Sequence, residues 1–163
     1  MKRIRLKAGV VITVIALGFA FCALWQPTSV IADNQVPRPE RIKGDGIIQV
    51  DLSNCDTNGY CASTLDSWGE STHAGRYTNV ASGSTRLSDL TFFANGVLTA
   101  ANGDQIFWEE NGTPEIVMTG GTGRFQGITG SFAFTKFDVQ GITVEYPIVS
   151  VMVSFEGEGT ITY

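Results

Sequence analysis

Few side chains in this sequence could take part in catalysis, and they do not form a familiar catalytic motif. His73 is the one histidine of the chain, so a serine triad would have to use it. Ser71 is too near in sequence and shares its strand face, and no Gly-x-Ser-x-Gly turn presents a serine nucleophile. An isolated imidazole in a strand more often serves as a structural hydrogen-bonding group than as a catalytic base.

An aromatic residue and an acid lie together near the middle of the chain. In a strand, Trp108 and Glu110 share one face while Phe107 and Glu109 share the other. Burial of Glu110 would raise the pKa of its carboxyl and suit it to act as an acid or a base. Acids are seldom buried without a partner, so the sequence favours a solvated strand end for Glu110. The cations that could pair with a buried acid are Arg76, Arg86 and Arg124.

Six polar or aromatic side chains are therefore the candidates for contact with a ligand. An enzyme is expected to point at least two of them into a roomy cavity, one with a displaced pKa. A binding protein needs only the cavity, and a structural barrel is filled by its own side chains. The candidates are His73, Arg76, Tyr77, Trp108, Glu110 and Arg124.

No metal or cofactor site is predicted. Two cysteines and one histidine outside the first 32 residues are too few soft ligands for a metal. The turn Asn102, Gly103 and Asp104 lacks the carboxylates of a calcium loop and is typical of a hairpin.

The glycine-rich segment 120–130 has neither the spacing of a dinucleotide loop nor that of a phosphate loop, and no helix pattern follows it. Gly121, Gly123 and Gly127 are expected instead to take positive φ in a tight crossing between two strands. Phe125, which lies among them, is expected to plug one end of the fold.

The N-terminal segment has the pattern of an export signal. Four basic residues lie within positions 2–7, an uncharged run from Ala8 to Trp25 follows, and Val30-Ile31-Ala32 precedes the expected cleavage point. The alternative is an uncleaved membrane anchor, since residues 8–25 are just long enough to cross a bilayer. In both cases the rest of the chain is expected on the non-cytoplasmic side, periplasmic or secreted. Residues 33–43, with Pro37 and Pro39, are expected to be a linker.

The part that follows residue 32 is acidic and suits a single domain. It keeps seven basic and sixteen acidic side chains, a formal charge of −9. Such a surface repels phosphate backbones, so nucleic acid is not an expected partner. A small molecule is the expected partner, and contact with a membrane is expected only through an uncleaved N-terminal segment.

Two cysteines in this part are predicted to form a disulfide. Cys55 and Cys61 flank the turn pair Asn58-Gly59, and an oxidising compartment favours their bond. A ring this short is worth about 2 kcal/mol by loop-entropy arguments.

Hydrophobic alternation with period two indicates an all-β domain over residues 44–163. In the C-terminal run Val149, Val151, Val153 and Phe155 share one face, with serines and glutamates on the other. Asn-Gly pairs at residues 58, 95, 102 and 111 are typical of hairpin turns. The expected strands are 46–52, 72–82, 88–93, 97–100, 105–109, 115–119, 130–137 and 147–163.

About eight antiparallel strands must close into a barrel or pack as a β-sandwich in order to hide their edges. A long last strand with internal glycines favours the barrel, because glycine permits the bend at a barrel corner.

Three sequence blocks resemble those of a group of uncharacterised exported bacterial proteins. They are Ser71 to Thr78, Thr99 to Asp104, and the segment Gly-Gly-Thr-Gly-Arg-Phe-Gln-Gly-Ile-Thr-Gly at residues 120–130. The group is similar in fold to the calycin-like barrels of allene oxide cyclase and dirigent proteins, whose members cyclise or steer reactive small molecules. The resemblance implies a barrel with a cavity. It implies no catalytic set, because the functional residues of those families match no positions here.

Three functions follow in order from these observations. The first is the binding of a small apolar ligand in the barrel or at its mouth, since nothing in the sequence supplies an activated nucleophile, a metal site or a cofactor loop. The second is a cyclase or isomerase that folds a reactive substrate in the same cavity. The third is a structural or interaction role at the cell surface.

Overall fold

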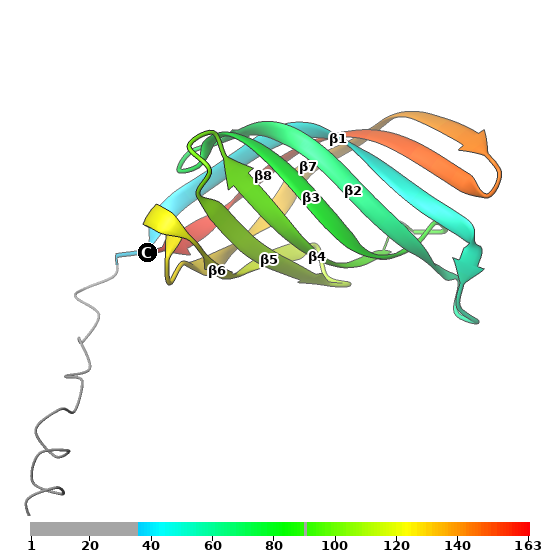
Figure 1. The fold of residues 1–163 in the computed structure, drawn as a ribbon, viewed down its shortest axis with the longest axis horizontal. Coiled ribbons are helices and arrows are strands. Elements are labelled where there is room, and N and C mark those ends of the chain that lie inside the picture. The colour runs from blue at the N-terminus through cyan, green and yellow to red at the C-terminus, as the bar shows by residue number, and fades with distance from the viewer. Residues whose placement is uncertain (1–35, 90) are drawn as a thin grey trace, which may run out of the picture. The chain divides into compact units, whose positions relative to one another are not determined.

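The chain folds as an antiparallel β-barrel in the computed structural model, which describes residues 36–89 and 91–163 (Figure 1). The eight strands pair in chain order, and β8 pairs with β1 to close the ring. This confirms the predicted fold class and excludes the sandwich. The strands are β1 Arg38–Cys55, β2 Tyr60–Ser71, β3 Gly75–Arg86, β4 Thr91–Ala100, β5 Gln105–Asn111, β6 Glu115–Gly121, β7 Thr129–Glu145 and β8 Ile148–Thr162, with a 3-10 turn, η1, at Gly123–Phe125.

The expected export signal or membrane anchor, residues 1–32, lies outside the described residues. Within the described ranges no helix is long and apolar enough to span a bilayer.

The barrel forms because alternate residues of each strand carry apolar side chains. In β8 Val149, Val151, Val153 and Phe155 are buried, while the residues between them are partly or fully exposed. The other strands place a similar row on the inner face, as the period of two requires.

One end of the barrel is closed by the glycine-rich segment between β6 and β7. Phe125 of η1 is fully buried and Ile128 is 1% exposed, so Phe125 plugs this end as predicted. Gly123 and Gly127 take positive φ. Gly121 does not, and its role is space, because a Cβ there would lie 2.5 Å from the carbonyl oxygen of Gln105.

Four expectations about the strands differ from the structure. Residues 38–43 are not linker, because β1 begins at Arg38 and pairs with β8 from that residue on. Strand β2 was not predicted, since its many serines and threonines hide the apolar alternation. His73 lies in the turn between β2 and β3, not in a strand. Asn95-Gly96 lies inside β4, whereas Asn58-Gly59 and Asn102-Gly103 lie in turns and Asn111-Gly112 lies where β5 ends and the β5–β6 connection begins.

The wall of the barrel is lower on one side than on the other. Strand β6 pairs with β7 only between Gly130 and Ala133, whereas β8 pairs with β7 as far as Glu145. The β7–β8 hairpin therefore projects past the β5–β6 turn (Figure 1). The wall is low around β3 to β6 and high around β7, β8 and β1.

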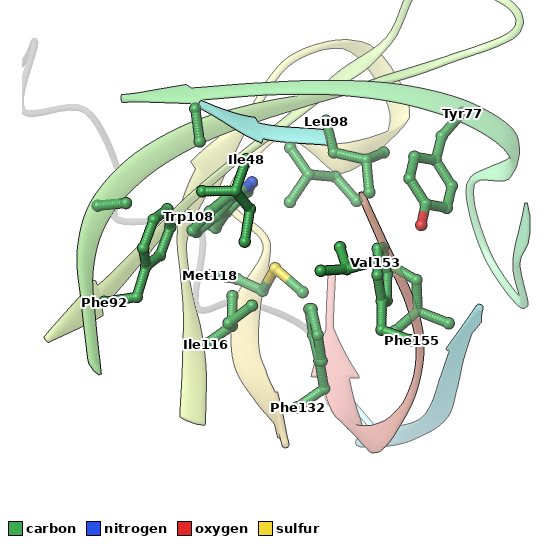
Figure 2. Packing of buried hydrophobic residues seen from close by; sticks show 14 of the residues in the cluster. Ile48, Tyr77, Phe92, Leu98, Trp108, Ile116, Met118, Phe132, Val153 and Phe155 are labelled. Carbon is green, nitrogen blue, oxygen red and sulfur yellow. The ribbon is translucent and has the colours of Figure 1, made fainter. Parts of the chain in front are cut away.

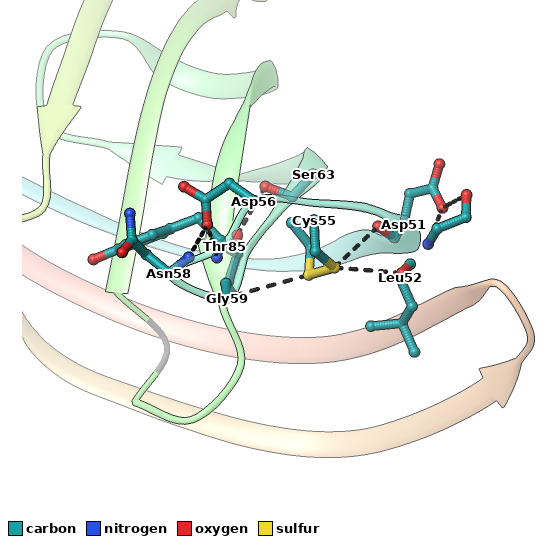
Figure 3. The surroundings of a disulfide bond; sticks show 11 residues. Asp51, Leu52, Cys55, Asp56, Asn58, Gly59, Ser63 and Thr85 are labelled. Carbon is teal, nitrogen blue, oxygen red and sulfur yellow. Dashed lines mark hydrogen bonds between the residues drawn. A yellow bond between two sulfur atoms is a disulfide. The ribbon is translucent and has the colours of Figure 1, made fainter.

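The predicted disulfide between Cys55 and Cys61 is present and lies in the β1–β2 hairpin (Figure 3). Asp56 stabilises the turn, because its Oδ1 accepts hydrogen bonds from the backbone N–H of Asn58 at 2.8 Å and of Tyr60 at 2.9 Å. The disulfide therefore fixes a loop at the high side of the barrel.

Candidate ligand-binding cavity

The barrel interior contains a cavity of about 520 Å³. Its wall is mainly aromatic and aliphatic, and Figure 2 shows side chains from several strands converging on it. Residues of the β3–β4 and β5–β6 connections also line it, among them Asp89, Thr113 and Pro114. The cavity therefore reaches the end of the barrel opposite the Phe125 plug. The apolar lining includes Ile48, Phe92, Leu98, Ile106, Ile116, Met118, Phe132, Phe134, Val153 and Phe155.

A chain of hydrogen bonds crosses one wall of the cavity. The indole Nε1 of Trp108 donates to Oδ1 of Asn79 at 2.7 Å, and Nδ2 of Asn79 donates to Oγ of Ser67 at 3.1 Å. The three residues come from β5, β3 and β2. Trp108 reaches Asn79 across β4 because Gly96 has no side chain, and a Cβ there would lie 2.2 Å from the indole.

Asn79 and Ser67 were not among the predicted site residues. Both are buried and both line the cavity. The signal for Asn79 was its spacing, because it lies two residues after Tyr77 and so shares the inward face of that strand. Ser67 had no comparable signal, since β2 itself was not predicted.

Tyr77 lines the cavity and its hydroxyl donates to the carbonyl oxygen of Lys43 at 3.4 Å. Burial raises the pKa of this phenol well above its usual value, and the nearby carboxylates of Asp45 and Glu40 raise it further. The hydroxyl therefore stays protonated and serves as a hydrogen-bonding group.

Glu110 is half-buried and lines the cavity, so it is not the solvated strand end that the sequence favours. It lines the cavity with Trp108 from the same face of β5. Burial raises the pKa of its carboxyl to about 7. Among the described residues, no hydrogen-bond or ion-pair partner contacts its side chain. Glu110 is left to interact with whatever occupies the cavity.

The arginines that could have paired with Glu110 are engaged elsewhere or face away. Nε of Arg86 donates to Oδ1 of Asp89 at 3.0 Å, and Nε of Arg124 lies 3.7 Å from Oδ2 of Asp104. Arg76 is exposed on the outer face of β3. Among the residues that the structure describes, the cavity therefore contains a carboxyl with no lining cation.

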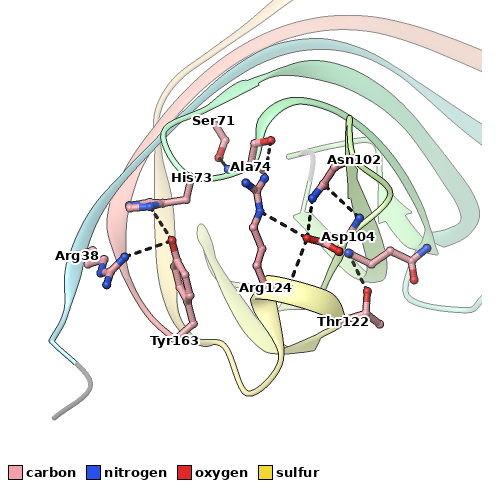
Figure 4. A network of polar contacts seen from close by, with 10 residues as sticks. Arg38, Ser71, His73, Ala74, Asn102, Asp104, Thr122, Arg124 and Tyr163 are labelled. Carbon is pink, nitrogen blue, oxygen red and sulfur yellow. Dashed lines mark hydrogen bonds and ion pairs between the residues drawn. The ribbon is translucent and has the colours of Figure 1, made fainter. Parts of the chain in front are cut away.

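His73 and Arg124 lie at the closed end, away from the cavity lining (Figure 4). His73 Nε2 lies 3.0 Å from the carbonyl oxygen of Pro39, and Nδ1 lies 3.1 Å from the hydroxyl of Tyr163. Because a carbonyl only accepts, Nε2 carries the proton and Nδ1 accepts from Tyr163. Arg124 donates to the carbonyl oxygen of Ala74 at 3.2 Å. These contacts join the β2–β3 turn to β1, β8 and η1.

Glu40 lies beside His73 and is the least satisfied acid of the closed end. Its Oε2 is buried without a hydrogen-bond partner and lies 3.9 Å from Nε2 of His73. Burial raises the pKa of this carboxyl, and hydrogen bonds from the Ser71 side chain and from the backbone of His73 and Thr72 oppose the rise.

The segment Asn102, Gly103 and Asp104 forms the β4–β5 turn, as predicted. Nδ2 of Asn102 donates to Oδ2 of Asp104 at 2.7 Å, and Gly103 has a positive φ of 90°. Among the described residues, no group of three or more His, Cys, Asp or Glu side chains is placed to hold a metal ion.

Strand pairing and cavity together define an eight-stranded antiparallel barrel with an apolar interior cavity. No family model matches the chain, and no curated protein matches it. Among solved structures, the chain is similar to a pterocarpan synthase dirigent protein at 11% identity and a TM-score of 0.46, over 80% of this chain and 88% of that one. The fold assignment rests on the strand pairing. The resemblance to exported bacterial proteins stays a prediction.

Proposed function

We propose that the domain binds a small, mainly apolar molecule inside the barrel. The observation that carries the proposal is the cavity of about 520 Å³ with its aromatic and aliphatic wall. Ligand sites are commonly apolar hollows of roughly 300–1,000 Å³ with a few polar groups that orient the ligand. Here the polar groups include Glu110, Tyr77 and the row from Trp108 to Ser67. A purely structural barrel would fill this space with its own side chains.

The proposed binding takes place outside the cytoplasm. The disulfide between Cys55 and Cys61 supports this location, because such bonds persist in oxidising compartments. The basic and apolar pattern of residues 1–32 supports it independently.

Binding is tested with the neutral fluorescent probe N-phenyl-1-naphthylamine and the full chain as its host cell processes it. Met118 points into the cavity, while the adjacent Val117 is exposed on the outer face of the same strand. Met118→Trp fills the cavity and is expected to weaken probe binding at least tenfold. Val117→Trp adds the same ring outside and is expected to leave binding within about twofold.

Two outcomes would overturn the proposal. One is a wild-type chain that does not enhance probe fluorescence, and the other is equal binding by the two tryptophan variants. If Met118→Trp does not fold by circular dichroism, Ile116→Phe replaces it, with Val117→Phe as its matched control. Native mass spectrometry of wild-type protein from its own envelope then identifies a retained molecule.

Glu110 supports a second candidate function, cyclisation or isomerisation of the bound molecule by proton transfer. A carboxyl that has no partner among the described residues, lines an apolar cavity and has a pKa of about 7 can give or take a proton at neutral pH. The test compares the molecules retained by the wild type and by Glu110→Gln. A catalyst is expected to retain product in the wild type and unchanged substrate in the variant, whereas a binding protein retains the same molecule in both.

A further inference from the structure

Within the part of the chain that the structure describes, strand β7 has a free edge along its C-terminal half. It pairs with β6 only from Gly130 to Ala133. From Phe134 to Glu145 its one described neighbour is β8, and this part forms the projecting hairpin of Figure 1. The backbone N–H and C=O groups along such an edge are open to another strand.

The free edge also exposes apolar side chains. Phe137, Val139, Ile142 and Val144 are 39%, 45%, 63% and 65% exposed. They lie opposite Phe155, Val153, Val151 and Val149, and so they belong to the inner face of the sheet. An apolar row beside unpaired backbone is typical of a surface that a partner covers.

A bulge makes the sequence of inward-facing and outward-facing residues along this edge symmetric about its centre. The register shifts between Val139 and Gly141, so Gln140 and Gly141 both lie on the outer face. The hydrogen bond from Gln140 to Ser154 agrees with that placement. From residue 136 to residue 145 the order is outer, inner, outer, inner, outer, outer, inner, outer, inner, outer. The order is the same when read from either end.

We propose that two copies of the chain form a two-fold dimer by antiparallel pairing of their β7 edges, with Lys136 of each copy opposite Glu145 of the other. This register also sets Phe137 against Val144 and Val139 against Ile142. Every inner residue meets an inner residue, and each charged end meets its opposite charge. Cross-strand pairs of both kinds stabilise antiparallel sheets.

Other registers lose this match. A shift of one residue places Phe137 against Glu145, which sets an apolar side chain against a charge on the other face. A shift of two residues places Asp138 against Glu145, and like charges that face each other are destabilising. Edge lysines and bulges often guard a strand against pairing. Here the bulge lies at the centre of the symmetric segment, so it selects one register.

The dimer is tested by sedimentation velocity of the full chain as its host cell processes it. The wild type is expected to dimerise with a Kd on the order of 10 µM, as suits a small interface. Lys136→Glu or Glu145→Lys alone places like charges together at two symmetric points, and each is expected to raise Kd at least tenfold. The double variant restores opposite charges and is expected to return Kd to within about threefold of the wild type.

Arg41→Glu is the matched control for net charge. Arg41 is exposed and pairs with Glu158 on the outer wall, so this variant should leave Kd unchanged. A wild type that stays monomeric at about 500 µM overturns the proposal. So does a double variant as weak as the single ones, because the proposed register requires the rescue. A monomer that sediments with phosphatidylcholine vesicles through Ile142 would assign the surface to a membrane and also overturn it.

Discussion

The indole N–H of Trp108 donates to the side-chain oxygen of Asn79 at 2.7 Å, although the two residues are 29 positions apart. The bond passes over Gly96 of the intervening strand β4. It satisfies the indole N–H and the side-chain oxygen of Asn79 in a wall that is otherwise mainly apolar. Three strands of the cavity wall are therefore held in one fixed arrangement.

Asn79→Ala is expected to lower the free energy of unfolding by about 1–3 kcal/mol, because it leaves the Trp108 N–H without its partner. Denaturant unfolding followed by tryptophan fluorescence measures the loss. Asn95→Ala, on the exposed face of β4, is the control and should change stability by less than about 0.5 kcal/mol. Equal effects of the two variants would contradict the role of Asn79.

Gly96→Ala is expected to cost about 2 kcal/mol or more, because its Cβ would lie 2.2 Å from the Trp108 ring. Trp108→Leu removes that ring. In a double-mutant cycle, Gly96→Ala should cost less in the Trp108→Leu background than in the wild type. Strict additivity of the two free-energy changes would show that the Trp108 ring does not depend on the space that Gly96 leaves.

Glu110 is expected to make the domain less stable as pH rises. Its folded pKa of about 7 lies above the ordinary 4.5, so the folded state holds the proton more tightly than the unfolded state. The free energy of unfolding should therefore fall between pH 4.5 and about 7 and level off above that. With partial exposure taken into account, the fall from Glu110 is about 2 kcal/mol.

Glu110→Gln should remove this share of the pH dependence and be more stable than the wild type at pH 8. Glu40 has a raised pKa too, so the measurement is the difference between the two chains across pH. Asp89 lines the same cavity, and in both the wild type and the variant it accepts a hydrogen bond from Arg86. Glu109→Gln, on the other face of β5, is the matched control and should keep the wild-type profile.

Cys55→Ala with Cys61→Ala is expected to lower stability by about 2 kcal/mol through the lost ring closure. Binding of N-phenyl-1-naphthylamine should not change, because neither cysteine lines the cavity. Reduction of the wild type with dithiothreitol should give the same loss. A loss of probe binding on reduction would mean that the β1–β2 hairpin shapes the cavity.

Tyr163→Phe is expected to cost about 1 kcal/mol, because the hydroxyl that donates to His73 is removed. His73→Ala should cost at least as much, since it also loses the contact with Pro39. Neither variant should alter probe binding if His73 serves only to brace the closed end. A tenfold loss of probe binding in His73→Ala would return this residue to the ligand site.

Local sequence patterns predicted much of the barrel correctly. The alternation from Val149 to Phe155 identified the inner face of β8, and three of the four Asn-Gly pairs marked the connections between strands. These features are local, since side-chain direction repeats every two residues and turn geometry depends on adjacent residues. Asn95-Gly96 misled the prediction because the space beneath Trp108, and not a turn, requires that glycine.

The candidate site was only partly predictable. Tyr77, Trp108 and Glu110 were among the six candidates and line the cavity, whereas His73, Arg76 and Arg124 do not. The alternation placed Trp108 and Glu110 on one face of β5 but could not say whether that face is inner.

The sequence by itself therefore determined an all-β chain, its main turns and its disulfide, because these depend on residues close together along the chain. Only the tertiary structure decided that Asn79 meets Trp108 and that, among the described residues, Glu110 faces the cavity without a cation and β7 keeps a free edge. Those relationships depend on how far each strand extends past its neighbour when the barrel closes. Closure brings together residues that no local pattern connects.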